Sequence, residues 1–173
     1  MRKKMGCYML FSPLEVFTVS FFGHRYVDNF SMAERKIDTL IRKLLQEKEY
    51  VEFLVGRDGD FDQLVSSAIR RAKRDIGDRN CAHVWLLPYP TAEFRDNEES
   101  FYEYYDEIEI ASNTTGNIHP KGAFQARNRM MVDRSELVVV YIDHESGGAW
   151  QTYKYAQKND KSIINLAEET EEL

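Results

Sequence analysis

The fold is indicated by a stretch near the start of the chain that reads Val16-Phe17-Thr18-Val19-Ser20-Phe21-Phe22 and ends at Gly23-His24-Arg25. Its residues are almost all apolar, and most are β-branched or aromatic. A short run of this kind is typical of a strand that is buried on both faces of a sheet. A helix is predicted next, because apolar residues recur at helical spacing from Ile37 to Leu45. Ser31 and Glu34 form a capping-box pattern, which predicts where that helix begins.

Strands and helices continue to alternate along the rest of the chain. Further strands are predicted at 51–55, 83–87, 137–142 and 161–166, with a short one at 107–110. Helices are predicted over about 61–74, within 93–110, over 122–135 and over about 149–156, with a loop at 113–117. This order predicts an α/β fold: a Rossmann-like, doubly wound, mostly parallel sheet of about five strands with helices on both faces.

The chain has 173 residues, enough for one domain with its own core, and no linker or repeat divides it. We therefore expect a single domain over 1–173, with its core at about 16–166. The N-terminal segment and the acidic C-terminal tail are expected to be peripheral. Only two cysteines occur, Cys7 and Cys81, and no apolar run is long enough to cross a membrane. These features favour a cytoplasmic protein with no membrane partner.

The net charge of −6 means that the chain lacks the general positive charge of a nucleic-acid binder, so nucleic acid is not expected as a partner unless one surface carries a local basic patch. No Cys-x-x-Cys or His-x-x-x-His spacing is present, so no metal site is predicted, and no cofactor is predicted either. Doubly wound domains often pair, and a homodimer is therefore an expectation by analogy.

Chemistry is concentrated at three junctions where a predicted strand ends, and all three should face the same rim of the sheet. At the first, Gly23 allows a tight turn or close approach to a ligand, while Arg25 can pair with phosphate. His24 can donate a hydrogen bond or transfer a proton near neutral pH. The alternative is a strand-ending glycine followed by two solvated polar residues.

The second junction reads Gly56-Arg57-Asp58-Gly59-Asp60-Phe61-Asp62. Asp60 or Asp62 can simply cap the following helix. In the functional alternative, Gly59 presents backbone N–H groups and Asp58 or Asp62 holds a ribose hydroxyl.

The third junction reads Ser146-Gly147-Gly148-Ala149, where free N–H groups at a helix start would form an anion site. The alternative there is a flexible turn. Arg127 and Arg134 on the 122–135 helix, and Lys121 just before it, can reach the same rim or form an ordinary solvated face. Three tyrosines in the aromatic-acidic segment 93–110 can stack on a base, although packing is the commoner use; they are Tyr102, Tyr104 and Tyr105.

Together these motifs resemble the YpsA-like branch of the SLOG superfamily, which includes DprA-like and LOG-like proteins. The matching pieces are Phe21-Phe22-Gly23-His24-Arg25, Gly56-x-x-Gly59-x-x-Asp62, Arg127-Asn128-Arg129-Met130-Met131-Val132-Asp133 and Ser146-Gly147-Gly148. The resemblance implies a pocket for a nucleotide or nucleotide-derived ligand, such as a nucleoside phosphate, ADP-ribose or an NAD derivative. LOG-like members cleave an N-glycosidic bond with a Pro-Gly-Gly-x-Gly-Thr-x-x-Glu motif. This chain departs from that motif, because Ser146-Gly147-Gly148 is followed by Ala149-Trp150-Gln151-Thr152.

Three functions follow as hypotheses, and the first is favoured. The leading one is binding or sensing of a nucleotide-derived small molecule by Gly23, His24, Arg25, Gly56, Gly59, Asp62, Arg127, Ser146, Gly147, Gly148 and Ala149. The second is hydrolysis of the ligand's N-glycosidic bond, with the catalytic residue chosen among His24, Asp58, Asp62 and Glu145. The third is a protein-interaction module that docks a partner through the aromatic-acidic segment.

Overall fold

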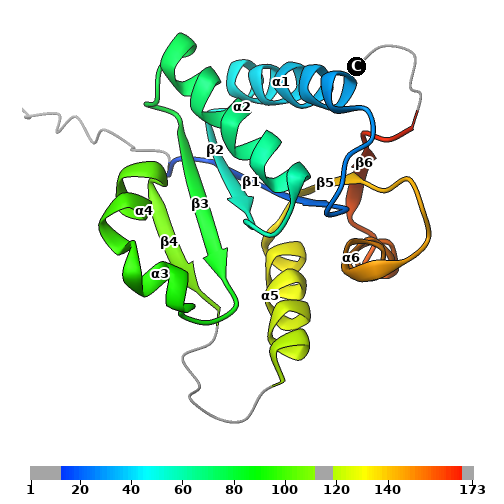
Figure 1. The fold of residues 1–173 in the computed structure, drawn as a ribbon. Helices are drawn as coiled ribbons and strands as arrows, with labels where there is room; N and C mark the ends of the chain where they lie inside the picture. Colours follow the sequence, from blue (N-terminus) through cyan, green and yellow to red (C-terminus); the bar gives the residue numbers. More distant parts are fainter. Residues whose placement is uncertain (1–12, 112–118, 169–173) are drawn as a thin grey trace, which may run out of the picture.

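The computed structural model describes residues 13–111 and 119–168 (Figure 1). The N-terminal segment up to residue 12, the loop predicted at 113–117 and the tail from 169 onwards lie outside the described residues.

A parallel sheet forms the centre of the molecule. Its strands are β1 (Val16–Gly23), β2 (Tyr50–Val55), β3 (Cys81–Leu87), β4 (Glu107–Ile110), β5 (Leu137–Tyr141) and β6 (Ser162–Asn165). They lie in the order β4-β3-β2-β1-β5-β6, and every neighbouring pair is parallel. The predicted Rossmann-like class is therefore confirmed. The sheet has six strands because the short strand β4 is present and pairs with β3.

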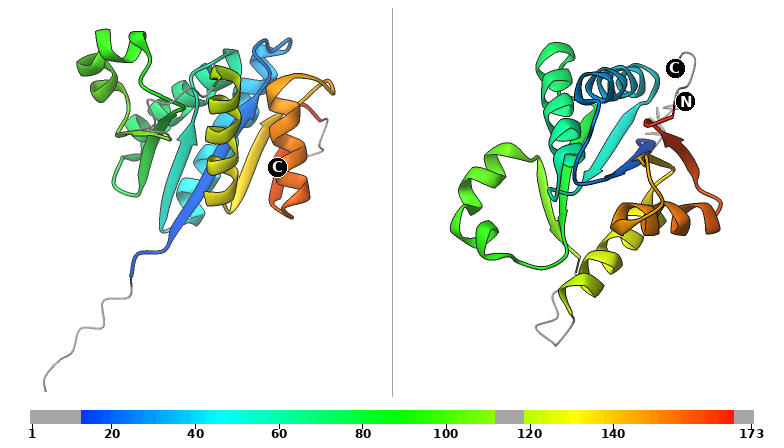
Figure 2. Two further views of the ribbon diagram at one scale, coloured as in Figure 1. Left: turned by 90° about the horizontal axis from the view of Figure 1, so that it is seen from below. Right: turned by 45° about the vertical axis from the view of Figure 1, so that its right-hand side comes forward.

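Helices cover both faces of this sheet, as the two views of Figure 2 show. They are α1 (Phe30–Glu47), α2 (Asp60–Ile76), α3 (Ala92–Asp96), α4 (Glu98–Tyr104), α5 (Pro120–Arg134) and α6 (Gly147–Lys158). Helices α1 and α2 pack together on one face, and α5 and α6 pack together on the other. No helix in these described ranges has the length and apolar character that a bilayer span requires.

Helix α1 begins one residue before the predicted capping box. Its cap is Asn29, whose side-chain oxygen accepts a hydrogen bond from the Met32 N–H at 3.1 Å. The prediction of Ser31 as the cap is therefore wrong. Asparagine caps helices at least as well as serine, and it stands two residues earlier in the chain.

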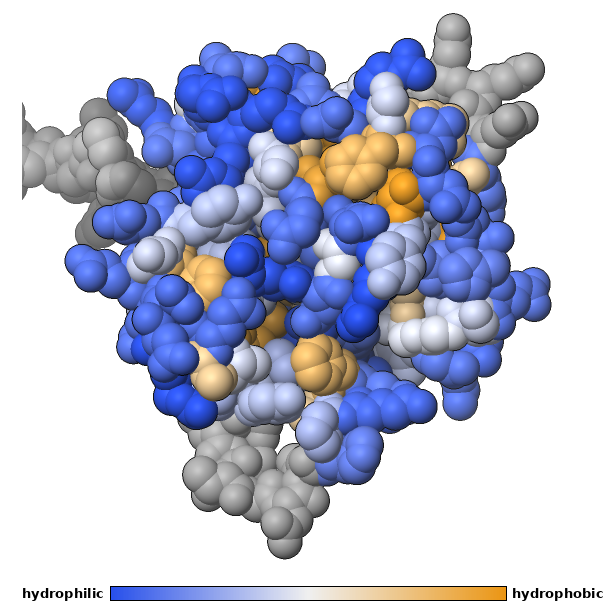
Figure 3. All heavy atoms as spheres, viewed as in Figure 1, coloured by the Kyte–Doolittle hydropathy of each residue, from blue (hydrophilic) through white to orange (hydrophobic). Residues whose placement is uncertain are grey.

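The segment between β3 and β4 contains two short helices, α3 and α4, instead of the one predicted. Their aromatic rings pack inward on Trp85, with Phe101 at 4.8 Å and Tyr105 at 5.1 Å between ring centroids. Packing is therefore the use that the structure makes of most of these rings. Figure 3 shows a mainly hydrophilic surface on the face seen in Figure 1, with apolar residues in separate patches.

The order of the strands reverses between β1 and β5. From β1 the chain builds outward through β2, β3 and β4 on one side, and through β5 and β6 on the other. In sheets of this type, ligands bind in the crevice beyond the carboxyl ends of the two strands where the order reverses.

Candidate ligand site

A cavity of about 400 Å³ lies at this point of reversal. Its walls come from the segment after β1, the turn after β2, the loop after β5 and one side of α5. The volume falls within the range of small-molecule sites. The structure thus brings residues that are more than 120 positions apart in the chain to one cavity.

All of the residues predicted to bind the ligand line this cavity, and so do the catalytic candidates His24, Asp58 and Asp62. Glu145 is exposed and is not among the lining residues. Arg134 and Lys121 do not line it either; Arg134 forms ion pairs with Glu52 and Glu109 instead. The cavity also contains residues that were not predicted to bind the ligand: Phe21, Phe22, Tyr26, Phe124, Asn128, Met131 and His144.

Gly23, in the first junction, is required by packing inside the protein. A Cβ atom at Gly23 would lie 2.3 Å from Cγ of Phe61, which is fully buried at the start of α2. Packing also requires a glycine at position 59, because a Cβ atom there would lie 2.7 Å from Cα of Arg25. These two glycines therefore allow α2 and its turn to pack against the segment after β1.

The second junction forms a charged cluster with α5. Arg127 is 5% exposed, and it donates from Nη1 to the Leu86 carbonyl oxygen at 3.1 Å and from Nη2 to Asp58 Oδ2 at 3.0 Å. Asp62 Oδ2 accepts a hydrogen bond from the Asp58 N–H at 2.8 Å. A Cβ at Gly56 would lie 2.8 Å from that same carboxylate oxygen. Gly56 thus leaves room for a carboxylate and a guanidinium at the cavity wall.

The acidic residues of this turn do not cap α2 as one alternative predicted. The N-cap of α2 is Gly59, with no side-chain hydrogen bond to the first turn. Desolvation instead raises the pKa of Asp62 to about 6, against the opposing influences of the Asp58 N–H and of Arg127. A carboxyl group that titrates near neutral pH beside a cavity is suited to proton transfer.

The third junction leaves the amino end of α6 uncapped. Ser146 occupies the N-cap position and makes no side-chain hydrogen bond there. Gly147 has φ of +84°, a conformation that favours glycine. A Cβ at Gly148 would have nothing within 4 Å. Gly147, Gly148 and Ala149 line the cavity, and no side chain caps the first N–H groups of α6. An anion at this end of the cavity would be stabilised by those N–H groups and by the helix dipole.

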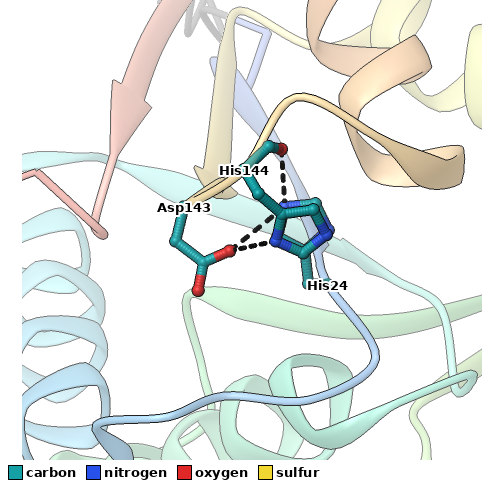
Figure 4. A group of neighbouring side chains, drawn as sticks. All are labelled: His24, Asp143 and His144. Atoms are coloured by element: carbon teal, nitrogen blue, oxygen red, sulfur yellow. Dashed lines mark hydrogen bonds and ion pairs between the residues drawn. The ribbon is translucent and has the colours of Figure 1, made fainter.

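Asp143 and His144, in the loop after β5, were not predicted as site residues from the sequence. Asp143 Oδ1 lies 2.5 Å from Nδ1 of His144 and 3.5 Å from Nε2 of His24, so it connects the loop after β5 to the end of β1 (Figure 4). His24 is 6% exposed, and desolvation is the main cause that lowers its pKa. The sequence does show a polar Asp-His pair after its most apolar strand, and this pair could have been noted as a candidate. Its position beside His24 follows only from the pairing of β5 with β1.

Comparison with solved structures supports this architecture. DNA processing protein A from Helicobacter pylori aligns with a TM-score of 0.58 and 20% identity over 85% of this chain and 63% of its own. DNA processing protein A (DprA) from Streptococcus pneumoniae aligns with a TM-score of 0.63 and 16% identity over 86% of this chain and 49% of its own. The chain has a DprA-like Rossmann fold. It spans about half to two thirds of the length of these two proteins.

A third similar structure is the molybdenum cofactor carrier protein MCP from Chlamydomonas reinhardtii. It aligns with a TM-score of 0.54 and 11% identity over 86% of this chain and 75% of its own. A scan against protein-family models and a search of curated proteins each returned no match.

The expectation that nucleic acid is not a partner is wrong as argued. The Helicobacter pylori protein, which shares this fold, is described by its single-stranded DNA binding mode. The net charge of a whole chain does not decide the matter, because binding depends on the local charges of one surface.

Proposed function

We propose that the cavity binds a nucleotide or nucleotide-derived ligand and that the chain belongs to the YpsA-like branch of the SLOG superfamily. The observation that carries the proposal is the meeting of the three glycine-bearing junctions at one cavity, where the strand order reverses. A DprA-like fold agrees with this assignment.

The phosphate would bind at the amino end of α6. The N–H groups of Gly147, Gly148 and Ala149 supply donors, and Gly148 leaves the space that an anion needs. Arg25, in the segment after β1, is exposed and lines the same cavity, where it would add a positive charge.

The ribose would lie toward the second junction. Asp58 and Asp62 offer carboxylate oxygens that accept hydrogen bonds from hydroxyl groups, and Arg127 holds Asp58 in place. A nucleoside sugar is a suitable partner for these acceptors, whereas a phosphate would be repelled by them.

Hydrolysis of the N-glycosidic bond is a second candidate function, and the pKa of Asp62 near 6 favours it. A carboxyl group in this range can be protonated as a general acid or ionised as a base at neutral pH.

We still expect a cytoplasmic protein, since Cys81 is a buried free thiol.

Isothermal titration calorimetry tests the proposal. AMP, ADP-ribose, NAD and a short single-stranded oligothymidylate would each be titrated into the protein. We expect at least one of the three nucleotides to bind with one site per chain. If none binds at millimolar concentration, the proposal fails, and binding of the oligothymidylate alone would assign the cavity to DNA. Chromatography of the bound nucleotide then separates a binding protein, which returns it intact, from a hydrolase, which releases free base.

A further inference from the structure

His24, Asp143 and His144 form a compact cluster in the segments that follow β1 and β5 (Figure 4). The two imidazole rings are stacked, with centroids 3.5 Å apart and planes 12° from parallel. His24 is buried, whereas the side chain of His144 is 57% exposed, and both residues line the cavity. One ring of the pair is thus open to solvent or ligand.

The hydrogen bonds determine where the protons lie. A carbonyl oxygen only accepts, so Nε2 of His24, 3.1 Å from the His144 carbonyl oxygen, carries a hydrogen. Nδ1 of His144 faces Asp143 Oδ1 at 2.5 Å and carries a hydrogen as well. In its neutral form, His144 therefore has its free lone pair on Nε2.

The same three side chains are close enough together to hold a metal ion. Their present arrangement does not suit one, because imidazole lone pairs lie in the ring plane. Two rings stacked nearly parallel cannot direct their lone pairs at one ion about 2 Å from each nitrogen. Both nitrogens that face Asp143 also carry hydrogens, so the arrangement is that of an oriented acid–base group.

We propose that His144, oriented by Asp143, is a proton-linked contact for the anionic group of the ligand. When a phosphate occupies the amino end of α6, Nε2 of His144 takes up a proton from solvent and donates a hydrogen bond to a phosphate oxygen. This inference rests on the proposed function, since it needs an anion at that end of the cavity.

The charges around the two histidines favour one positively charged ring at most, and they favour His144 over His24 for it. Asp143 Oδ1 lies beside Nδ1 of His144, and the phosphate would place a second negative group beside the same ring. Two stacked imidazolium rings would repel each other, and burial already disfavours the charged form of His24. The other charged or titratable groups near the cluster or across the cavity are Arg25, Tyr26, Asp58, Asp62, Arg127, Tyr141 and Glu145.

Calorimetry in buffers of different ionisation enthalpy measures the proton directly. ADP-ribose is the first probe, because its pyrophosphate does not titrate between pH 6.5 and 8.5. We expect wild-type protein to take up a fraction of one proton per ADP-ribose at pH 7, and its affinity to fall several-fold from pH 6.5 to 8.5. If AMP binds and ADP-ribose does not, the same comparison is made with AMP, whose own titration is common to all variants.

His144→Asn is the test variant, because asparagine keeps a donor near the position of Nδ1 and removes Nε2. His119→Asn is the matched control; His119 caps α5 outside the cavity, and asparagine preserves a cap. We expect the proton uptake to disappear in His144→Asn, with affinities that converge on wild type at pH 8.5, and to persist in His119→Asn.

Two different failures can be told apart. If the nucleotide binds with no proton uptake, or if uptake survives in His144→Asn, the role of His144 is refuted while the proposed function stands. If no nucleotide binds to any variant, the proposed function itself fails.

Discussion

Gly23 and Gly148 line the same cavity, but we predict opposite outcomes when each is replaced by alanine. A Cβ at Gly23 would lie 2.3 Å from Cγ of Phe61, whereas carbon atoms pack at about 3.5–4.0 Å. Phe61 is fully buried, and Tyr141 lies 5.9 Å away between ring centroids, so the ring has little space into which it can move. We expect Gly23→Ala to cost about 3 kcal/mol, at the upper end of overpacking in protein cores.

A Cβ at Gly148 meets nothing within 4 Å, and alanine favours a helix more than glycine does. We therefore expect Gly148→Ala to keep the free energy of unfolding or raise it by about 0.5 kcal/mol. The methyl group would occupy the space predicted for the phosphate, so the affinity for nucleotide should fall by roughly tenfold, which equals about 1.4 kcal/mol.

Urea unfolding and calorimetry with ADP-ribose measure the two effects separately. For a chain of this size, the expected loss in Gly23→Ala lowers the melting temperature by roughly 6–12 °C. The reasoning is refuted if Gly148→Ala binds nucleotide as tightly as wild type, or if Gly23→Ala is as stable as wild type.

Three further substitutions follow from the same contacts. The pKa of Asp62 is raised to about 6, so the free energy of unfolding should fall as pH rises from 4 to 7 and the buried carboxyl group ionises. This fall is at most about 3 kcal/mol. Urea unfolding of Asp62→Asn should show no such fall. Burial lowers the pKa of His83 to about 3, so the protein should lose stability as pH falls from about 6.5 toward 3; an acid-unfolding profile of His83→Leu that kept the same slope would contradict this. Arg127→Met should cost about 1–3 kcal/mol in urea unfolding, because the buried Leu86 carbonyl oxygen loses its donor while the half-exposed Asp58 can be solvated. A loss below about 0.5 kcal/mol would show that Arg127 does not hold the cavity wall.

The sequence predicted the fold well because the signals are local. Continuous apolar runs such as 137–142 indicate buried parallel strands, and helical spacing indicates the helices between them. The end of β1 and the turn of Gly56 and Gly59 were also correctly grouped, since parallel strands bring their carboxyl ends to one edge.

The contacts that individual residues make in the folded protein were harder to predict from the sequence. Gly23 was predicted to allow a tight turn or the close approach of a ligand. The contact that requires a glycine is with Phe61, whose position depends on how α2 packs. The pairing of Asp143 and His144 with His24 joins segments 120 residues apart. Arg134 was given two alternatives, the rim or an ordinary solvated face. It lines neither the cavity nor a free face, because it forms ion pairs with Glu52 and Glu109.

The central claim is that a nucleotide phosphate binds at the amino end of α6, and amide chemical shifts test it most directly. We predict that titration with ADP-ribose or AMP shifts the backbone N–H signals of Gly147, Gly148 and Ala149 more than any others. If the nucleotide binds but its largest shifts fall on α3 and α4, with the α6 amides unchanged, the account is contradicted.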